Sequence, residues 1–171
     1  MPTMITIRNY TEKDAPEVGR LIADTYSEFN LAFASPQEHD LMLGPFRHAH
    51  STDEAHRDAI RQILQSPLFF VAEQDGQIAG VLRGRRERLA SLFVHKDHQR
   101  RGVARRLVAA FENEMFTEGV LVIRVAATLY AVPFYQKLGY QKSTGVRTSW
   151  SFDGYGLPVQ PMRKVLRQDP A

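Results

Sequence analysis

The sequence predicts an α+β domain built on a mixed sheet, in which an antiparallel meander precedes a strand–helix–strand unit. Short apolar runs between residues 68 and 94 are separated by turn signals, which is typical of antiparallel strands. A long amphipathic run follows at residues 101–116, and a second apolar run comes after it at residues 120–126. The predicted order of elements is therefore β-α-α-β-β-β-α-β-α-β-β.

One strand and two helices are predicted before the meander. Residues 4–8 alternate apolar and polar, as a strand does. Asp14, Pro16 and Glu17 favour the start of a helix, since an aspartate can cap it, a proline suits its first turn and a glutamate can close the capping box. The apolar face of this helix holds Val18, Leu21, Ile22, Thr25 and Phe29. Residues 30–50 are predicted to be irregular. A second capping box, Ser51-Thr52-Asp53-Glu54, begins a helix with the apolar stripe Ala55, Ala59, Ile60, Ile63 and Leu64 that ends at Pro67.

The meander consists of strands predicted at residues 68–73, 77–82 and 87–94. Asp75-Gly76 joins the first two, because a type I′ turn needs a positive φ at both central positions. A further turn is predicted at residues 84–86.

The second half contains two more helices and three strands. The helix at 101–116 buries Val103, Leu107, Ala110, Phe111 and Met115, and Gly119 suits a left-handed cap at its end. The run at 120–126 is almost continuously apolar, which predicts a strand buried on both faces. A short helix at 131–138 is closed by Gly139. Strands at 140–144 and 162–166 complete the sheet.

Length and composition favour one domain over residues 1–171, with 43% hydrophobic and 24% charged residues. There are no cysteines, which excludes disulfides and a thiol nucleophile and favours a cytoplasmic protein. No signal peptide or membrane span is expected. The net charge is only +3, but arginines are clustered at positions 83, 85, 86 and 88 and at positions 100, 101, 105 and 106. These clusters are interpreted either as a solvated basic face or as an anion site.

The start of the helix near Arg101 has the features of an anion site. The first turn of a helix has free backbone N–H groups and the positive end of the macrodipole. Gly102 and Ala104 are small enough for a phosphate to approach the backbone, and Arg100, Arg101 and Arg105 add positive charge. We expect a pyrophosphate to bind here. The segment is neither a Walker loop nor a dinucleotide fingerprint, because it lacks the Gly-Lys-Ser/Thr ending and has one glycine.

Two motifs in this half resemble those of the GNAT superfamily of acyl-CoA N-acyltransferases. Gln99-x-x-Gly102-x-Ala104 is similar to the family pattern Q/R-x-x-G-x-G/A, and it follows Leu92-Phe93-Val94-His95, which resembles the family's fourth strand. The segment from Thr128 to Tyr140 resembles N-x-x-A-x-x-F-Y-x-K-x-G-F/Y, with Thr128 at the asparagine position. The match covers about residues 87–140, and residues 25–66 match nothing specific.

The resemblance implies a GNAT-like fold in which the central strands splay apart and acetyl-CoA lies between them as co-substrate. The residues that it assigns to acetyl-CoA are Leu92, Phe93, Val94, Gln99, Arg100, Arg101, Gly102, Val103, Ala104, Arg105, Thr128 and Phe134. Leu92, Phe93 and Val94 would pair with the pantetheine through their backbone, as an added strand does.

The implied reaction is transfer of an acetyl group to a primary amine. The ammonium must lose a proton, the oxyanion needs a donor and the leaving sulfur benefits from an acid. By resemblance, Tyr135 is the acid and a backbone N–H near Phe93 is the oxyanion donor. Glu87 and Glu73 are the candidate bases, with water as the alternative. A structural or solvent-exposed role is favoured for His95 and His98. His48 with His50 is a weak metal signal without a carboxylate or cysteine at ligand spacing.

The acceptor is not identified by the sequence, and it is a small-molecule or peptide amine. Candidate lining residues are Tyr26, Phe29, Phe33, His39, Phe46, His48, Trp150, Phe152, Asp153 and Tyr155. Core packing is the alternative for Phe29 and Phe33. The alternative functions are a non-catalytic acyl-CoA-binding sensor and, less favoured, a nucleic-acid-binding protein. No nucleic-acid or membrane partner is expected, and a homodimer is considered.

Overall fold

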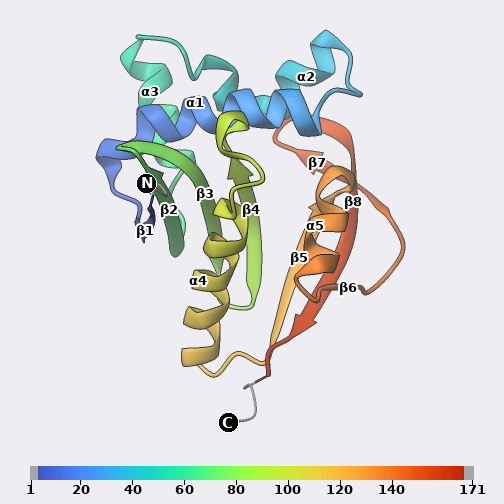
Figure 1. Ribbon diagram of the computed structural model, residues 1–171. Helices are drawn as coiled ribbons and strands as arrows, with labels where there is room; N and C mark the ends of the chain where they lie inside the picture. The colour runs from blue at the N-terminus through green and yellow to red at the C-terminus, as the bar shows by residue number, and fades with distance from the viewer. Residues whose placement is uncertain (1–3, 168–171) are drawn as a thin grey trace.

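Eight strands form one sheet in the computed structural model, which describes residues 4–167 of the chain (Figure 1). In chain order they are β1 (Ile5–Asn9), β2 (Leu68–Gln74), β3 (Gln77–Arg85), β4 (Arg88–Val94), β5 (Val122–Thr128), β6 (Gln141–Lys142), β7 (Arg147–Ser151) and β8 (Gly154–Val165). Their order across the sheet is β1-β2-β3-β4-β5-β8-β6, and β7 also pairs with β8. Only β4 and β5 pair in parallel within the described residues, so the predicted mixed sheet with an antiparallel meander is confirmed.

The helices lie on both faces of this sheet (Figure 1). They are α1 (Ala15–Thr25), α2 (Pro36–Leu43), α3 (Glu54–Ile63), α4 (Val103–Thr117) and α5 (Val132–Lys137). A π-helical segment, Tyr26–Asn30, continues α1, and short 3-10 segments lie at Glu12–Asp14, Gly44–His48, Lys96–His98 and Leu129–Ala131. In Figure 1, α1, α2 and α3 cross the upper end of the sheet, where β4 ends.

The sheet separates two hydrophobic cores. The first lies beneath α1, α2 and α3, and the second beneath α4 and α5. Strand β3 contributes to both because its side chains alternate, so Val81 belongs to the first core and Leu82 to the second. The two faces of the central strands are therefore chemically distinct, and each face is built against different helices.

The prediction that residues 30–50 are irregular is wrong. Helix α2 begins at Pro36, and Ser35 caps it by accepting from the Glu38 backbone at 3.3 Å. Glu38 accepts in return from the Ser35 backbone at 3.2 Å. This capping box is present in the sequence, and it stands before a helix too short and too weakly amphipathic to produce a strong periodic pattern.

The final strands also differ from the prediction. The strand placed at 162–166 is the end of the twelve-residue β8, and the one placed at 140–144 shortens to β6. Strand β7 was not predicted. Pro158 and Pro161 lie within β8, although prolines usually argue against a paired strand because they lack a backbone donor. Pairing with β5, β6 and β7 holds β8 extended in spite of them.

Two helix caps and one burial pattern are corrected as well. Asp14 does not cap α1 through its side chain but binds Arg8 and Thr11, and α3 is capped by Asp53 rather than from Ser51. Strand β5 is not buried on both faces, since Ile123, Val125 and Ala127 are buried while Arg124 is exposed. The reason is that α1–α3 cover only part of the sheet, so the lower end of β5 faces solvent on that side.

The turn between β3 and β4 lies at Arg86-Glu87 rather than at 84–86, and Glu87 takes a left-handed φ of 68°. The turn at Asp75-Gly76 has positive φ at both residues, as predicted. Gly119 and Gly139 also have positive φ, which confirms their predicted positions after α4 and α5. Within residues 4–167, no helix has the length and apolar character needed to cross a membrane.

Candidate active site

A β-bulge in β4 determines the geometry of the candidate site. Arg83 of β3 pairs with Ser91 of β4, but the next residue, Gly84, pairs with Leu89, so Ala90 has no partner on β3. The extra residue inverts the alternation of side chains between the two faces of the sheet after this point. Leu89 therefore packs in the core beneath α4, whereas Phe93 packs in the core beneath α1.

The parallel pairing of β4 with β5 ends at the same bulge. Register pairs are present at Arg88↔Arg124 and Leu89↔Val125, and no further pair joins these strands within the described residues. Figure 1 shows β4 and β5 together at their lower ends and diverging above. The edge of β4 from Ser91 to Val94 therefore has no neighbouring strand on the β5 side. Such an edge presents backbone N–H and C=O groups to any extended group that lies against it.

The predicted anion-binding turn follows directly from this free edge. Gly102 precedes α4 with φ +83°, and Arg100 has φ 62°. The first intrahelical bond of α4 runs from the Arg106 amide to the Gly102 carbonyl at 3.1 Å. The amides of Val103, Ala104 and Arg105 therefore have no acceptor within the helix, and they lie at the positive end of its macrodipole.

Open space and positive charge surround these amides. A Cβ atom built on Gly102 would meet nothing within 4 Å, so the backbone there is accessible. Arg100, Arg101 and Arg105 are exposed and form no ion pair within residues 4–167. Free amides, a helix N-terminus and unpaired guanidinium groups form the donor set that a pyrophosphate requires. The sequence did not show that Gly102 is needed for its left-handed φ rather than for its small size.

Buried contacts fix this turn to the meander. The His95 amide donates to the Ala79 carbonyl at 2.8 Å. His98 is 8% exposed, and its Nδ1 lies 2.8 Å from Oε1 of the buried Gln74. Because an amide oxygen only accepts, Nδ1 is the donor. Burial lowers the pKa of His98, which supports its predicted structural role.

Tyr135 lies on the other side of the free edge, in α5. It is 3% exposed, and its ring packs edge-on against Phe134 and Tyr140 at centroid distances of 5.3 and 5.4 Å. Burial raises the pKa of Tyr135 above its usual value of 10. Because burial disfavours the phenolate, the phenol keeps its proton in the neutral range. The hydroxyl forms no hydrogen bond among the described residues, so this proton is not committed to another side chain.

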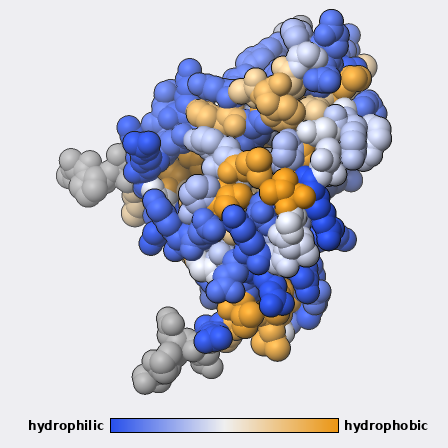
Figure 2. Space-filling model, turned by 90° about the vertical axis from the view of Figure 1, so that its right-hand side faces the viewer, coloured by the Kyte–Doolittle hydropathy of each residue, from blue (hydrophilic) through white to orange (hydrophobic). Residues whose placement is uncertain are grey.

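Thr128 ends β5 and contacts the π-helical segment after α1. Its hydroxyl donates to Oδ1 of Asn30 at 3.0 Å, and beside it Phe29 and Tyr130 stack at 5.3 Å. These residues line a cleft of about 300 Å³ together with Ala32, Phe33, Leu129, Leu157 and Pro158. Phe33 and Tyr130 are more than half exposed, so core packing does not explain Phe33. Figure 2 shows apolar side chains exposed among hydrophilic ones on the side of the molecule that lies at the right of Figure 1.

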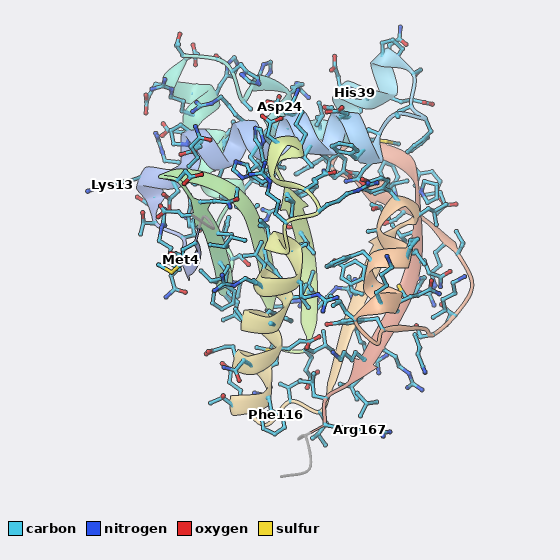
Figure 3. All side chains as sticks on the ribbon, in the orientation of Figure 1. Met4, Lys13, Asp24, His39, Phe116 and Arg167 are labelled. Carbon is cyan, nitrogen blue, oxygen red and sulfur yellow. The ribbon has the colours of Figure 1, made fainter. Side chains whose placement is uncertain are left out.

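The predicted acceptor residues are only partly brought together. Tyr26 packs against Phe93 at 5.6 Å and reaches Ser151 at 2.6 Å, which connects the acceptor segments to β4. Ser151 donates its proton to the Met42 carbonyl at 2.8 Å, so Tyr26 is the donor to Ser151. The remaining residues are more scattered. Phe46 is buried in the core, Trp150 and Tyr155 pair on the exposed β7–β8 hairpin, and His39 lies on α2 at the outer end of the molecule (Figure 3).

The two candidate bases occupy different environments. Glu73 accepts from the Arg8 guanidinium at 2.8 Å, so its carboxylate is already paired. Glu87 is exposed in the turn before β4, at the end of that strand farthest from the predicted anion-binding turn at Arg100–Arg105. Its backbone carbonyl accepts from the Arg124 amide at 2.9 Å, which helps to hold β4 and β5 together.

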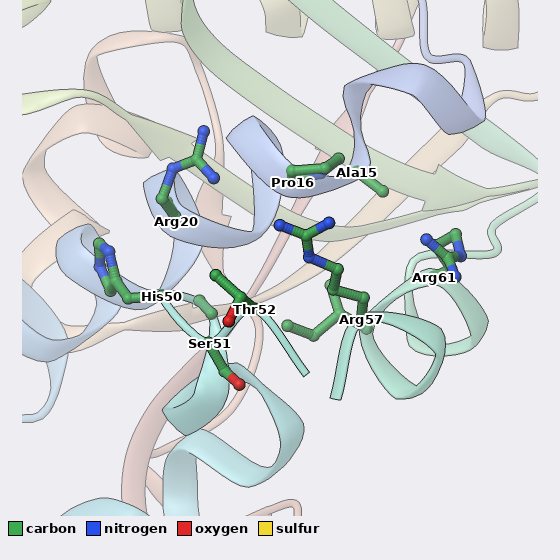
Figure 4. Close-up of a pocket in the computed structure, with 10 residues that line it drawn as sticks. Ala15, Pro16, Arg20, His50, Ser51, Thr52, Arg57 and Arg61 are labelled. Carbon is green, nitrogen blue, oxygen red and sulfur yellow. The ribbon is translucent and has the colours of Figure 1, made fainter. Parts of the chain in front are cut away.

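A second cavity, of about 130 Å³, lies between α1 and α3 (Figure 4). Its lining includes Arg20, His50, Arg57 and Arg61. Arg61 pairs with Glu54 and Asp58, and His50 pairs with Asp24. This cavity is separate from the free edge of β4. Among the described residues, no group of three or more His, Asp or Glu side chains is arranged to hold a metal.

The fold is shared with solved structures of N-acetyltransferases. A GCN5-related N-acetyltransferase from Rhodopseudomonas palustris superposes with a TM-score of 0.76 at 24% identity, over 97% of this chain and 99% of that one. The PaiA N-acetyltransferase of Thermoplasma acidophilum, solved with coenzyme A, gives 0.69 at 18% identity over 95% and 99%. The acetyltransferase YncA of Salmonella typhimurium, described as putative and solved with acetyl-CoA, gives 0.62 at 18% identity over 98% and 97%. No curated protein sequence matches the chain.

The family model of the GNAT acetyltransferase domain matches residues 25–166. The chain therefore belongs to the GNAT acetyltransferase family, and it is an acyltransferase. The match confirms the family resemblance recognised from the two motifs, and it extends well beyond the residues that carry them.

Proposed function

We propose that the protein transfers the acetyl group of acetyl-CoA to a primary amine by direct attack in a ternary complex. The observation that carries this proposal is the free edge of β4, which leads from the bulge at Ala90 directly into the phosphate turn at Arg100–Arg105. Two solved relatives of the same fold contain coenzyme A or acetyl-CoA. Acetyl-CoA is accordingly the co-substrate in this proposal.

The residues proposed to hold acetyl-CoA are those predicted from the motifs. Backbone groups of Leu92, Phe93 and Val94 supply the partner strand for the pantetheine, because this edge has no other strand. The free amides of Val103, Ala104 and Arg105, with the guanidinium groups beside them, suit the pyrophosphate. Gln99 donates from Nε2 to the Val94 carbonyl at 3.3 Å and so supports the start of the turn. Thr128 and Phe134 complete the set on the β5 and α5 side.

The reaction needs no covalent enzyme intermediate. The lone pair of the neutral amine forms the C–N bond, a tetrahedral oxyanion results, and its collapse breaks the C–S bond and releases a thiolate. A backbone N–H near Phe93 is the proposed donor to the oxyanion. The chain has no cysteine, so an acyl-cysteine is excluded.

Tyr135 is the proposed acid for the departing sulfur. It is buried, and the pKa of its phenol is raised by burial, so it carries its proton throughout the neutral range. Donation to a thiolate would then be followed by recovery of a proton from solvent. Positioning of such an acid typically contributes about 10²–10⁴ in rate.

The attacking ammonium must lose its proton to a base. Of the two candidate carboxylates, Glu87 is the one without an ion pair among the described residues, since Glu73 is paired with Arg8. Glu87 is exposed, and it lies at the end of β4 where β4 and β5 still pair. Water is therefore the immediate proton acceptor in this proposal, and Glu87 acts only through water.

Thermal unfolding with and without acetyl-CoA tests the cofactor site. At about 100 times its Kd the ligand adds roughly 2.7 kcal/mol, which raises Tm by about 5–10 °C for a domain of this size. The variant Arg101→Glu/Arg105→Glu should lose this rise, and Arg20→Glu/Arg57→Glu, with the same charge change on exposed residues elsewhere, should keep it. A folded parent without any rise at saturating acetyl-CoA would contradict the proposal. Thiol release with a panel of amines then distinguishes an enzyme from a non-catalytic sensor.

A further inference from the structure

Four arginines occupy successive register positions across four adjacent strands. Arg85 of β3 pairs with Arg88 of β4, Arg88 pairs with Arg124 of β5, and Arg124 pairs with Arg163 of β8. We call these four residues the arginine row. The row crosses the sheet where β4 and β5 still pair, before the two strands diverge toward the candidate active site.

All four side chains project from the same face of the sheet. Residues paired in register share a face, and their sequence neighbours take the opposite one. Those neighbours, Leu89, Val125 and Met162, are buried in the core beneath α4 and α5. The neighbour on β3 is Gly84, where a Cβ would lie 2.7 Å from the Phe111 ring of α4. The arginine row therefore lies on the face away from α4 and α5.

No helix of the described chain covers the row. All four arginines are exposed, and none forms an ion pair within residues 4–167. The C-terminal end of α3 reaches Arg83 of β3, whose guanidinium donates to the Ile63 carbonyl at 3.0 Å, and the row begins two residues farther along that strand. Glu87 is adjacent to Arg88 in sequence and makes no ion pair either. The row is therefore a strip of uncompensated positive charge.

Such a strip is unfavourable unless an anion offsets it. Neighbouring strands lie about 4.8 Å apart, so four cations fall within about 15 Å, and like charges directly opposite one another in a sheet are destabilising. The arginines are not needed to complete either core, because the cores are filled from their sequence neighbours. A function in binding explains the row better than a structural one.

The occupant that fits is an acidic peptide segment. Guanidinium groups recognise carboxylates through paired, charge-assisted hydrogen bonds. A nucleic acid fits less well because stacking platforms are absent from the neighbouring described positions on this face, which include Val122 and Val165. The exposed Trp150 and Tyr155 belong to the β7–β8 hairpin. Tyr155 lies eight positions before Arg163, about 26 Å along an extended strand.

We propose that the arginine row binds acidic side chains of a peptide acceptor whose N-terminal amine reaches the splay between β4 and β5. The proposal rests on the proposed acetyl transfer and names its substrate class. Arg88 precedes Leu92 by four residues, or about 13 Å of strand. An extended peptide spans the same distance in about four residues. Acidic residues at the third to fifth positions of the acceptor are therefore the ones that reach the row.

Binding tests the row independently of acetyl transfer. Two peptides with free N-termini and a dye at the C-terminus differ only in carrying glutamates or glutamines at positions three to five. Fluorescence anisotropy should give about tenfold tighter binding of the glutamate peptide to the parent protein, since several exposed pairs add together. Arg88→Glu/Arg124→Glu should abolish that preference, and Arg20→Glu/Arg57→Glu should retain it. The milder Arg85→Gln/Arg163→Gln variant provides the same comparison if charge reversal disturbs the fold.

Acetylation of the two peptides by the parent protein completes the test. The expected result is a kcat/KM about tenfold higher for the glutamate peptide, a ratio that falls to about one in Arg88→Glu/Arg124→Glu while the acetyl-CoA-induced rise in Tm is kept. Equal binding of both peptides by the parent protein would overturn the inference and leave the acetyltransferase proposal standing. Preferential binding without transfer to any amine would support the row and contradict the proposed reaction. Binding of a single-stranded oligonucleotide in place of the acidic peptide would also overturn the inference.

Discussion

Gln74 accepts a hydrogen bond of 2.8 Å from Nδ1 of His98, and both side chains are buried. This contact joins the end of β2 to the 3-10 segment Lys96–His98, which leads into the predicted anion-binding turn at Arg100–Arg105. Because burial lowers the pKa of His98, the folded protein resists its protonation. The stability that the neutral imidazole contributes is present above the unfolded pKa of about 6.5, and it is lost as the pH falls below that value.

We therefore expect the parent protein to lose thermal stability as the pH falls below about 6.5 toward the lowered pKa of His98, and His98→Gln to show a shallower loss over that range. Gln74→Glu should act in the opposite direction, because a carboxylate beside Nδ1 favours the imidazolium and raises the pKa of His98. Tm measured against pH for the three proteins checks this, with the His98 resonances followed by NMR. Identical pH profiles for the parent and His98→Gln would show that His98 does not titrate as described.

Tyr135→Phe should lower kcat without weakening acetyl-CoA binding. The substitution keeps the ring that packs between Phe134 and Tyr140 and removes only the hydroxyl. We expect a loss of about 10²-fold in kcat, the lower end of what a positioned acid contributes. In the parent protein, ionisation of Tyr135 should not reduce kcat below about pH 10, since burial raises its pKa. Full turnover by the phenylalanine variant at every pH would exclude Tyr135 as the acid.

Gly80→Ala should displace the start of α4, where the predicted anion-binding turn lies. A Cβ at this position would lie 2.9 Å from Val103 at the start of α4 and 3.1 Å from the Phe93 carbonyl of β4. Overpacking of this kind typically costs about 1–3 kcal/mol. We expect lower stability by urea unfolding and a higher KM for acetyl-CoA, since both the turn and the free edge must shift. Gly145→Ala is the matched control, because a Cβ there meets nothing within 4 Å and no change is expected.

Two substitutions at Glu87 separate a catalytic from a conformational role. Glu87→Gln removes the carboxylate and should leave kcat within about twofold of the parent if water is the base; a loss near 10²-fold would establish the carboxylate as a base instead. Glu87→Gly should stabilise the protein by up to about 1 kcal/mol, because a non-glycine residue at φ 68° carries a left-handed penalty. The kcat of Glu87→Gln tests the catalytic role, and the Tm of Glu87→Gly tests the backbone strain.

Local sequence signals predicted much of this protein. Asp75-Gly76, Gly119 and Gly139 adopt the positive φ expected of them, because a tight turn or a helix end imposes its backbone conformation on one or two residues. Helix α4 follows from apolar spacing alone. The phosphate turn was predicted from a glycine, a helix start and three arginines, all within eight residues. The capping box at Ser35 was equally local and went unrecognised because the helix behind it is short.

Tertiary structure decided the features that depend on register between distant strands. The bulge at Ala90, the end of β4–β5 pairing at Leu89 and the path of β8 through two prolines have no signature within their own segments. The arginine row is the clearest case, since its four members are spread from residue 85 to residue 163 and meet only when four strands align. Helix starts and tight turns are determined by neighbours in sequence, whereas register is determined by which side chains two strands can bury together. The sequence alone therefore identified the family, and through it predicted the anion-binding turn and the splayed central strands. Only the folded sheet located the bulge that ends β4–β5 pairing and aligned the four arginines on one face.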